Sequence, residues 1–387
     1  MQTPDRKRNP AAHDNRGMPL GTDKCAPARK ASIVRRHACG GGIAIGVFTP
    51  IAGALAFNKE IPMRKLATVS SLLGAMLLAV LSGAPAQAQQ PVSFVSFSGN
   101  DSNPCNLAMP CHTFAGAFAK TAVAGVIYCL DQSNFSDGTT FTITHSITID
   151  CDAVKGNVSA AFDTTAVMID GGVSDDVVLR GLDIAATGGT NVQGIYFFRG
   201  GTLHVQNCTI HGFGWGIFFQ NSQGPAMVLE VSDTALMYNG ISSLEGGIAV
   251  QPQVSPSISK AILNRVQVEN NFFGIKADGT QAGGVINMTV RDTVSSGNAS
   301  NGIVGTTNAG GAAIVMLVER SASSHNAAGF GVIADGAKTT IRLSNSAVSG
   351  NINGIGASNG GVLASYGNND VSGNSVDGNP TTMISPK

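Results

Sequence analysis

The chain has 387 residues, a formal net charge of zero, 43% hydrophobic residues and only 12% charged residues. This composition argues against a disordered polyelectrolyte and against a protein that binds nucleic acid through a basic surface. The net charge of zero results from two parts of the chain with opposite net charge. Residues 1–65 carry 12 of the 24 Lys and Arg but only 4 of the 24 Asp and Glu, so residues 66–387, with 12 basic and 20 acidic residues, have a net charge of −8.

A secretory signal lies inside the chain at residues 63–88. Met63-Arg64-Lys65 form its basic start, residues 66–81 its apolar segment, and Ala84-Pro85-Ala86-Gln87-Ala88 an A-x-A cleavage site. We therefore predict a secreted or periplasmic protein cleaved near Ala88, and we interpret residues 1–62 as a disordered, over-extended gene model. The rival interpretation, membrane segments at residues 40–57 and 66–81, needs about 20 apolar residues per span, and both segments are shorter.

Five cysteines follow the predicted cleavage site, as expected for a chain that folds in an oxidising compartment. Cys105 and Cys111 flank a short loop bounded by proline and predict a local disulfide. Cys129 and Cys151 can pair only if neighbouring coils bring them together. Cys208 is then left over, and we interpret it as a small buried apolar residue rather than a reactive thiol.

From residue 177 onward the chain repeats itself with a mean period of about 27 residues, a length typical of solenoid repeats. Short strands with alternating apolar residues, such as Ala261-Ile262-Leu263 and Met288-Thr289-Val290, are followed by turns rich in Asn and Gly and then by a Gly-apolar pair. Strands this short cannot bury a face alone and must stack on copies of themselves. The pattern predicts an all-β parallel β-helix with one coil of two or three strands per repeat.

Equivalent positions of successive coils should form interior columns with an interstrand spacing of about 4.8 Å. Asn and Gly should occupy the corners, because they tolerate positive φ. Asn270, Asn298, Asn326 and Asn351 lie near successive turns. The predicted first column is Ile195, Ile217, Ile248, Ile275, Ile303, Phe330 and Ile355, and the second is Phe197, Phe219, Val250, Ala277, Val332 and Ala357.

Several segments support a family resemblance. The opening Gly99-Asn100-Asp101-Ser102-Asn103-Pro104, the Pro110–Phe114 segment, Ile147-Thr148-Ile149-Asp150 and the closing Ser365-Tyr366-Gly367-Asn368-Asn369 resemble secreted bacterial proteins with right-handed parallel β-helix repeats, the pectin-lyase-like architecture. The resemblance covers about residues 92–380. It implies a right-handed parallel β-helix over residues 127–378, and it implies no defined activity.

The ends of a β-helix need covers, because terminal coils expose unpaired strand edges. We expect residues 92–126 to form an N-terminal cap in which residues 115–124 are helical. At the other end, residues 371–380 are rich in Gly and Asn and predict an irregular cap or frayed end, followed by a tail at residues 379–387.

Carboxylates give one candidate catalytic group. Asp131, Asp150 and Asp170 each end a short apolar strand, and Arg180 lies nearby in the sequence. Stacked in register, the three carboxylates would form a column that needs a cation such as Ca²⁺ or raised pKa values. That column would suit a polysaccharide lyase or a glycoside hydrolase. The interpretation that we favour is that each Asp accepts hydrogen bonds from turn amides.

Aromatic residues give a candidate binding surface. Alternation sends Phe197 and Phe219 inward and Tyr196 and Phe218 outward, with Trp215 at the end of the outward ladder. Flat rings of this kind stack on sugars. The alternatives are that another segment, such as residues 251–259, covers the rings, or that they contact another subunit and support oligomerisation.

These observations order the functional hypotheses. We predict a non-catalytic, exported β-helix that presents an elongated face to polysaccharide or to cell-surface partners. The alternatives are the lyase or hydrolase and a purely structural surface protein. Nucleotide binding is disfavoured because no Gly-rich loop with its Lys occurs between a strand and a helix, and the acidic body disfavours nucleic acid. No cofactor other than Ca²⁺ is implied.

Overall fold

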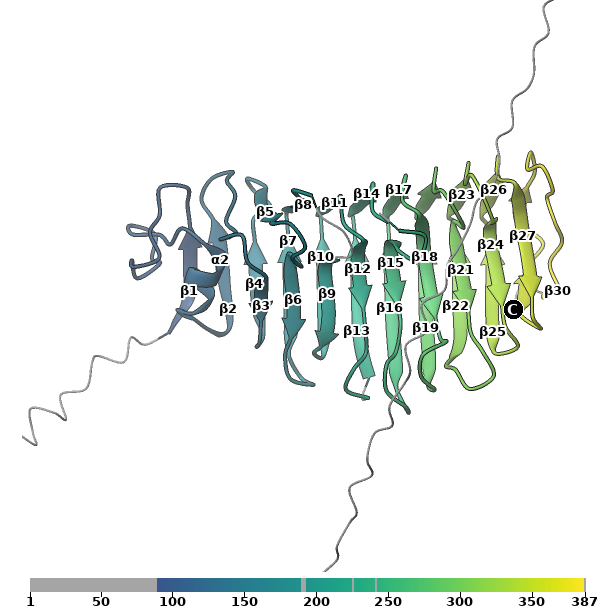
Figure 1. Ribbon diagram of the computed structural model, residues 1–387, viewed down its shortest axis with the longest axis horizontal. Helices are drawn as coiled ribbons and strands as arrows, with labels where there is room; N and C mark the ends of the chain where they lie inside the picture. Colours follow the sequence, from purple (N-terminus) through teal and green to yellow (C-terminus); the bar gives the residue numbers. More distant parts are fainter. Residues whose placement is uncertain (1–88, 189–192, 225, 241, 386–387) are drawn as a thin grey trace, which may run out of the picture. The chain divides into compact units, whose positions relative to one another are not determined.

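The computed structural model describes residues 89–385, except for residues 189–192, 225 and 241. The predicted signal peptide at residues 63–88 and the segment at residues 1–62 lie outside the described residues. In the described part, strands form three parallel sheets whose members alternate along the chain, so each complete coil contributes one strand to each sheet (Figure 1). This topology confirms the predicted parallel β-helix, with three strands per coil.

Sheet 1 is the largest, with twelve strands in sequence order along the stack. Its strands are β1 (Gln90–Val95), β2 (Thr121–Cys129), β4 (Ile147–Asp150), β7 (Asp176–Arg180), β10 (Thr202–Gln206), β13 (Ala226–Ser232), β16 (Ile258–Asn264), β19 (Val285–Arg291), β22 (Ala313–Glu319), β25 (Thr339–Ser344), β28 (Val362–Ser365) and β30 (Thr382–Met383).

Sheets 2 and 3 have nine strands each. Sheet 2 consists of β5 (Gly156–Ala160), β8 (Leu182–Ala186), β11 (Thr209–His211), β14 (Ala235–Met237), β17 (Gln267–Glu269), β20 (Val294–Ser296), β23 (Ala322–Ser324), β26 (Ala347–Ser349) and β29 (Asp370–Val371). Sheet 3 consists of β3 (Phe141–Ile143), β6 (Val167–Asp170), β9 (Gln193–Arg199), β12 (Trp215–Phe219), β15 (Gly246–Val250), β18 (Phe273–Asp278), β21 (Ile303–Thr306), β24 (Phe330–Asp335) and β27 (Asn353–Ser358).

The interior is built from columns of apolar side chains that face one another across successive strands. In sheet 3 the register aligns Ile195 with Ile217, Ile248, Ile275 and Ile303, as predicted. The next member is Val332, which pairs with Ile303 and Ile355, so the predicted place of Phe330 in this column is wrong. The reason is that the coil between Ile303 and Val332 is longer than the mean repeat. The second column loses Val332 and continues through Gly305 to Ala334 and Ala357.

A ladder of buried asparagines connects the coils at the turn between sheets 2 and 3. Each amide nitrogen donates to the side-chain oxygen of the next Asn, at 3.0 Å from Asn239 to Asn271, 2.9 Å from Asn298 to Asn326 and 2.8 Å from Asn326 to Asn351. Asn270 lies immediately before the ladder and adopts φ 56°, as predicted for a corner Asn, whereas Asn298, Asn326 and Asn351 are not among the residues with positive φ. The ladder explains why this turn requires Asn rather than any small polar residue, because only an amide both donates and accepts.

The N-terminal cap contains less helix than predicted. Helix α2 spans Phe114–Phe118, and Thr121 already begins β2. β2 pairs with β1 from Thr121 onward, and this pairing satisfies the backbone groups that a longer helix would otherwise use. At the opposite end, Thr382–Met383 pairs with β28, so the predicted tail adds a strand to the edge of sheet 1. None of the helices in the described ranges is long and apolar enough to span a membrane.

The cysteines pair as the sequence suggests. Cys105 is bonded to Cys111, and Cys129 to Cys151, which joins β2 to the residue that follows β4. Cys208 is free and buried, and its burial raises the pKa of the thiol to about 11. A thiol with that pKa is inert at neutral pH, in agreement with the structural interpretation.

We expect the double substitution Cys129→Ser and Cys151→Ser to lower the free energy of unfolding by about 3 kcal/mol, since this disulfide closes a loop of 22 residues in the unfolded chain. Guanidinium unfolding followed by far-UV circular dichroism measures the loss. Cys208→Ala is the control for removal of a buried sulfur without a crosslink, with an expected loss of about 1 kcal/mol. Equal losses in the two proteins would contradict the prediction.

Candidate functional site

The outward side of sheet 3 carries a set of stacked aromatic rings. Tyr196 on β9 and Phe218 on β12 lie opposite each other in the register, with ring centroids 5.7 Å apart and an interplanar angle of 20°. Phe218 also stacks on Trp215, at 6.1 Å and 12°. Phe197 and Phe219, the next residues along the same two strands, are fully buried, so the predicted alternation is confirmed. We call the outward residues of this sheet the aromatic face.

Trp215 differs from the sequence-based expectation. Only 8% of the residue is exposed. Its indole ring therefore packs against Phe218 and offers little surface of its own to a ligand. Gly216 explains why Trp215 lies on the same face as Phe218. A Cβ atom at Gly216 would approach Leu236 and Asn239 in the interior to 2.8 and 3.0 Å, so Gly216 and Ile217 both face inward. The additional inward residue brings Trp215 and Phe218, three positions apart, onto the same face.

A second group on the aromatic face was missed by the sequence analysis. Lys276 on β18 lies over the ring of Phe273, with its Nζ 5.2 Å from the ring centroid, and pairs with Asp278 at 3.0 Å. Burial acts to raise the pKa of Asp278, but the charge of Lys276 and hydrogen bonds from Thr280 outweigh it, and the pKa is lowered. The Asp278 carboxylate is therefore ionised at neutral pH, and it holds the ammonium against the ring.

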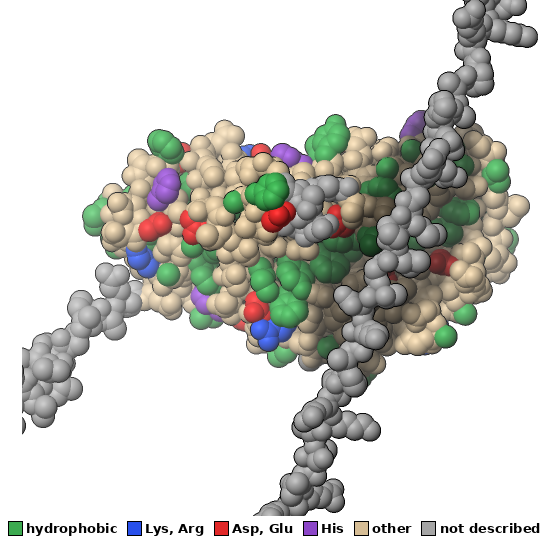
Figure 2. Space-filling view, in the orientation of Figure 1, with side chains coloured by type: hydrophobic (Ala, Val, Ile, Leu, Met, Phe, Trp, Pro, Cys, Tyr) green, Lys and Arg blue, Asp and Glu red, His purple; other side chains and the backbone are tan. Residues whose placement is uncertain are grey.

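Between the two aromatic groups, β15 presents only Gly246 and Ala249. Gly246 pairs with Trp215 and Phe273, and Ala249 with Phe218 and Lys276. Because both residues are small, the face is recessed between the rings. Figure 2 shows hydrophobic side chains gathered in a hollow over the region where Figure 1 labels β18, β21 and β24.

A row of polar side chains lies at the ends of successive sheet 3 strands, and it begins next to the rings. Gln251 donates to Asp278 at 3.1 Å, and Thr306 and Ser358 donate to Asp335 at 2.9 and 2.6 Å. Tyr196 donates its hydroxyl hydrogen to Gln220. These amides, carboxylates and hydroxyls supply both donors and acceptors next to flat apolar surfaces, which is the combination that a sugar ring can use.

The three predicted carboxylates do not come together. Asp131 accepts hydrogen bonds from the Ser96 hydroxyl at 2.6 Å and from the Phe97 amide at 2.9 Å. It therefore fastens the N-terminal loop, as expected for an Asp that binds turn amides.

Asp150 and Asp170 lie on different sheets. Asp150 ends β4 of sheet 1, lies opposite Arg180 and pairs with it at 3.5 Å, whereas Asp170 ends β6 of sheet 3 and pairs with Arg199. The predicted column of carboxylates is therefore wrong, because the three positions are separated in the sequence by less than one coil and cannot be equivalent. In the described ranges, no group of three or more His, Cys, Asp and Glu is placed to hold a metal ion.

A different titratable group forms on the outward side of sheet 1. His204 on β10 lies between two carboxylates, with Nε2 3.2 Å from Asp176 on β7 and Nδ1 3.1 Å from Glu230 on β13. The sequence predicts only that this mid-strand histidine faces solvent, and its side chain is 23% exposed. The signal that could have identified the group is its spacing, because each carboxylate lies close to one coil before or after His204 in the sequence.

In comparisons with known proteins, no family model and no curated protein matches the chain. Among solved structures the chain is similar to pectate lyase Pel9A, with 14% sequence identity, a TM-score of 0.47 and coverage of 73% of this chain and 79% of that chain. A rhamnogalacturonan lyase matches with 13% identity, a TM-score of 0.42 and coverage of 67% and 75%. The GH136 lacto-N-biosidase from Eubacterium ramulus matches with 10% identity, a TM-score of 0.36 and coverage of 84% and 71%.

Proposed function

We propose that the chain is an exported, non-catalytic β-helix protein that binds polysaccharide or a cell-surface glycan on the aromatic face of sheet 3. The observation that carries the proposal is the stack of Tyr196 and Phe218 beside a row of polar side chains. Adjacent strands lie about 4.8 Å apart, so a glycan chain running along the stack meets a new outward side chain at each strand.

Export is the second part of the proposal. The predicted signal peptide, with cleavage after Ala88, supports it, and so do the two disulfides, which persist in oxidising compartments. Amino-terminal sequencing of the secreted protein tests the cleavage site, and the expected first residue is Gln89.

A polysaccharide lyase or glycoside hydrolase is the second candidate, and one observation favours it. The Asp150–Arg180 pair and the Asp176–His204–Glu230 group occupy four neighbouring strands of sheet 1, so acid, base and cation lie on one surface. An activity screen on neutral and acidic polysaccharides, with and without Ca²⁺, decides between the two. If the wild-type protein releases product from a polysaccharide and Asp150→Asn does not, the lyase or hydrolase would replace our proposal.

We expect Tyr196→Ala and Phe218→Ala each to weaken glycan binding about ten-fold, since each removes one ring from the stack. A glycan array identifies a bound carbohydrate, and calorimetric titration with it measures the affinity. Phe162→Ala is the matched control, because Phe162 is 70% exposed and lies outside the three sheets.

The outcomes separate the three functional hypotheses. A wild-type protein that binds no glycan on the array contradicts the proposal. Glycan binding that falls equally in Phe162→Ala contradicts the placement of the site. If the two variants instead abolish self-association measured by sedimentation, the aromatic face joins subunits, and the purely structural alternative is favoured.

A further inference from the structure

The outward side of sheet 1 carries a groove toward its C-terminal end. Three cavities of about 310, 300 and 650 Å³ follow one another there. The first two share Ile262 and Thr289, and the second and third share Arg342, so they form one continuous depression from β16 to the residues after β30. We call this depression the cation groove. Its lining includes Lys260, Ile262, Thr289, Leu317, Arg342 and Tyr366.

The groove contains two unpaired cations. Among the lysines and arginines of residues 89–385, Lys260 and Arg342 are the two that make neither a hydrogen bond nor an ion pair, and both line the same cavity. The other lysines have partners: Lys276 pairs with Asp278, and Lys338 donates to the carbonyl oxygen of Gly311 at 3.1 Å. Two free cations in one cavity of an acidic body indicate a site for an anionic ligand.

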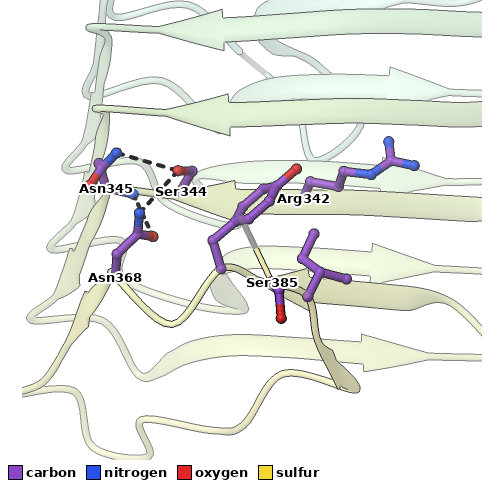
Figure 3. Close-up of a pocket in the computed structure, with 7 residues that line it drawn as sticks. Arg342, Ser344, Asn345, Asn368 and Ser385 are labelled. Atoms are coloured by element: carbon purple, nitrogen blue, oxygen red, sulfur yellow. Dashed lines mark hydrogen bonds between the residues drawn. The ribbon is translucent and has the colours of Figure 1, made fainter. Parts of the chain in front are cut away.

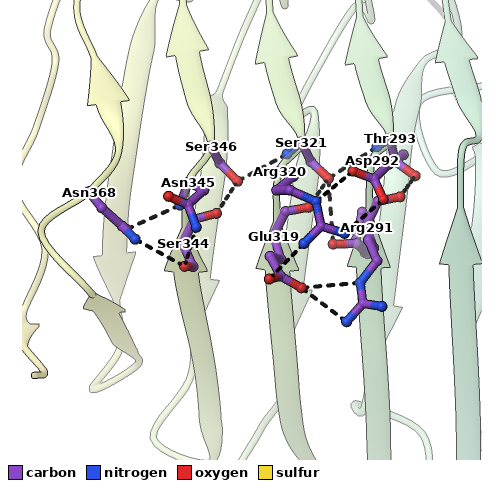
Figure 4. Close-up of polar contacts among 11 residues, drawn as sticks. Arg291, Asp292, Thr293, Glu319, Arg320, Ser321, Ser344, Asn345, Ser346 and Asn368 are labelled. Atoms are coloured by element: carbon purple, nitrogen blue, oxygen red, sulfur yellow. Dashed lines mark hydrogen bonds and ion pairs between the residues drawn. The ribbon is translucent and has the colours of Figure 1, made fainter. Parts of the chain in front are cut away.

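Two acidic side chains on the same sheet have partners of their own. Glu319 receives Arg291 at 3.1 Å and Arg320 at 2.9 Å (Figure 4), and Glu230 pairs with His204 at 3.1 Å. None of the side chains that line the three cavities is an Asp or a Glu. The lining of the groove therefore carries positive and no negative side-chain charge, although the net charge of residues 66–387 is −8.

The floor between the two cations is mixed in character. Ile262 and Val315 are 44% and 38% exposed, and Asn287 and Thr289 lie beside them in the same cavity. At the far end, Ser344, Asn345 and Asn368 form a group linked by hydrogen bonds, and the side chain of Arg342 extends away from them (Figure 3). Apolar patches beside hydroxyls and amides suit the two kinds of surface that a sugar ring presents.

The spacing of the cations sets the size of the ligand. Lys260 lies on β16 and Arg342 on β25, three strands further along sheet 1. At about 4.8 Å per strand, the two positions are about 14 Å apart along the stack. One small anion cannot reach both, whereas an extended chain with anionic groups at intervals can.

We propose that the cation groove binds an anionic glycan, whose carboxylate or sulfate groups pair with Lys260 and Arg342 while its rings lie on the floor between them. The groove is on sheet 1 and is separate from the aromatic face, so this site goes beyond the proposed function and does not depend on it.

The test measures the affinity of the protein for polygalacturonate, dextran sulfate and neutral dextran by calorimetric titration at low and high salt. We expect tighter binding of at least one charged polymer than of dextran, and weaker binding as salt rises. Lys260→Gln and Arg342→Gln should each lower that affinity about ten-fold, since each removes a charge-assisted contact. The preferred polymer identifies the anionic group as carboxylate or sulfate.

Lys155→Gln is the matched control, because it removes the same charge at an exposed site where Lys155 donates to the carbonyl of Asn207 at 2.6 Å. An equal loss of affinity in Lys155→Gln, or unchanged affinity in both groove variants, would overturn the proposal. Loss of charged-polymer binding in Tyr196→Ala, with normal binding in the groove variants, would also overturn it but would support the proposed function of the aromatic face.

Discussion

Replacing Phe219 by alanine is expected to lower the free energy of unfolding by about 4 kcal/mol, the largest effect that we predict. The side chain is fully buried and stacks on Phe197 with ring centroids 5.0 Å apart. In the column it lies between Phe197 and Val250, each held by its own strand. A cavity left there can close only if two neighbouring coils shift, and parallel pairing on both sides opposes that shift.

Guanidinium unfolding measured by far-UV circular dichroism gives the loss. Phe218→Ala is the matched control, since it removes the same side chain from the same strand at a partly exposed outward position. We expect it to cost about 1 kcal/mol. Similar losses in the two proteins would contradict the assignment of inward and outward sides in sheet 3, on which the aromatic face depends.

The fold class could be predicted because each coil repeats the same physical problem. Each short strand has one apolar side, and only stacking on equivalent strands removes that side from water. The isoleucine column from Ile195 to Ile303 is read directly from Gly-Ile pairs in the sequence. A fixed repeat length predicts the wrong column residue where a turn changes length. In the coil that ends at Val332, it selects Phe330 in place of Val332.

The candidate site was predicted only in part. Strand alternation is a local property, so the outward positions of Tyr196 and Phe218 follow from the sequence. The placement of Trp215 on the same face as Phe218 depends on two successive inward residues at Gly216 and Ile217, which no simple alternation includes. Lys276 is aligned with Phe218 through Ala249 only once the register of the intervening strand is known.

For the carboxylates, the sequence spacing suggests a contact that does not form. The arrangement of three strands in each coil places Asp150 and Asp170 on different sheets. With three strands per coil, equivalent positions are a full coil apart, as the directly paired Asp150 and Arg180 are. Asp150 and Asp170 end strands of the same sequence type, yet these strands belong to different sheets. The groups that do meet, such as Asp176, His204 and Glu230, are spaced by one coil.

The asparagine ladder carries the second large effect. Asn298 is fully buried, and its side-chain oxygen accepts from the amide nitrogens of the Asn271 backbone at 3.0 Å and side chain at 3.3 Å. Its own nitrogen donates to Asn326 at 2.9 Å and to Ser295 at 3.2 Å. Alanine at this position removes these hydrogen bonds and leaves the buried backbone N–H of Asn271 without an acceptor, because the turn has no access to water.

We therefore expect Asn298→Ala to lower the free energy of unfolding by about 3 kcal/mol, measured as for Phe219→Ala. Asn298→Asp adds a second test, since a carboxylate accepts from Asn271 but cannot donate to Asn326, and a partial recovery at best is expected. Asn308→Ala, which removes one exposed hydrogen bond to Thr280, is the control and should cost less than about 1 kcal/mol. Asn298→Ala as mild as this control would mean that the ladder follows from the stacking of the coils and does not hold them in register.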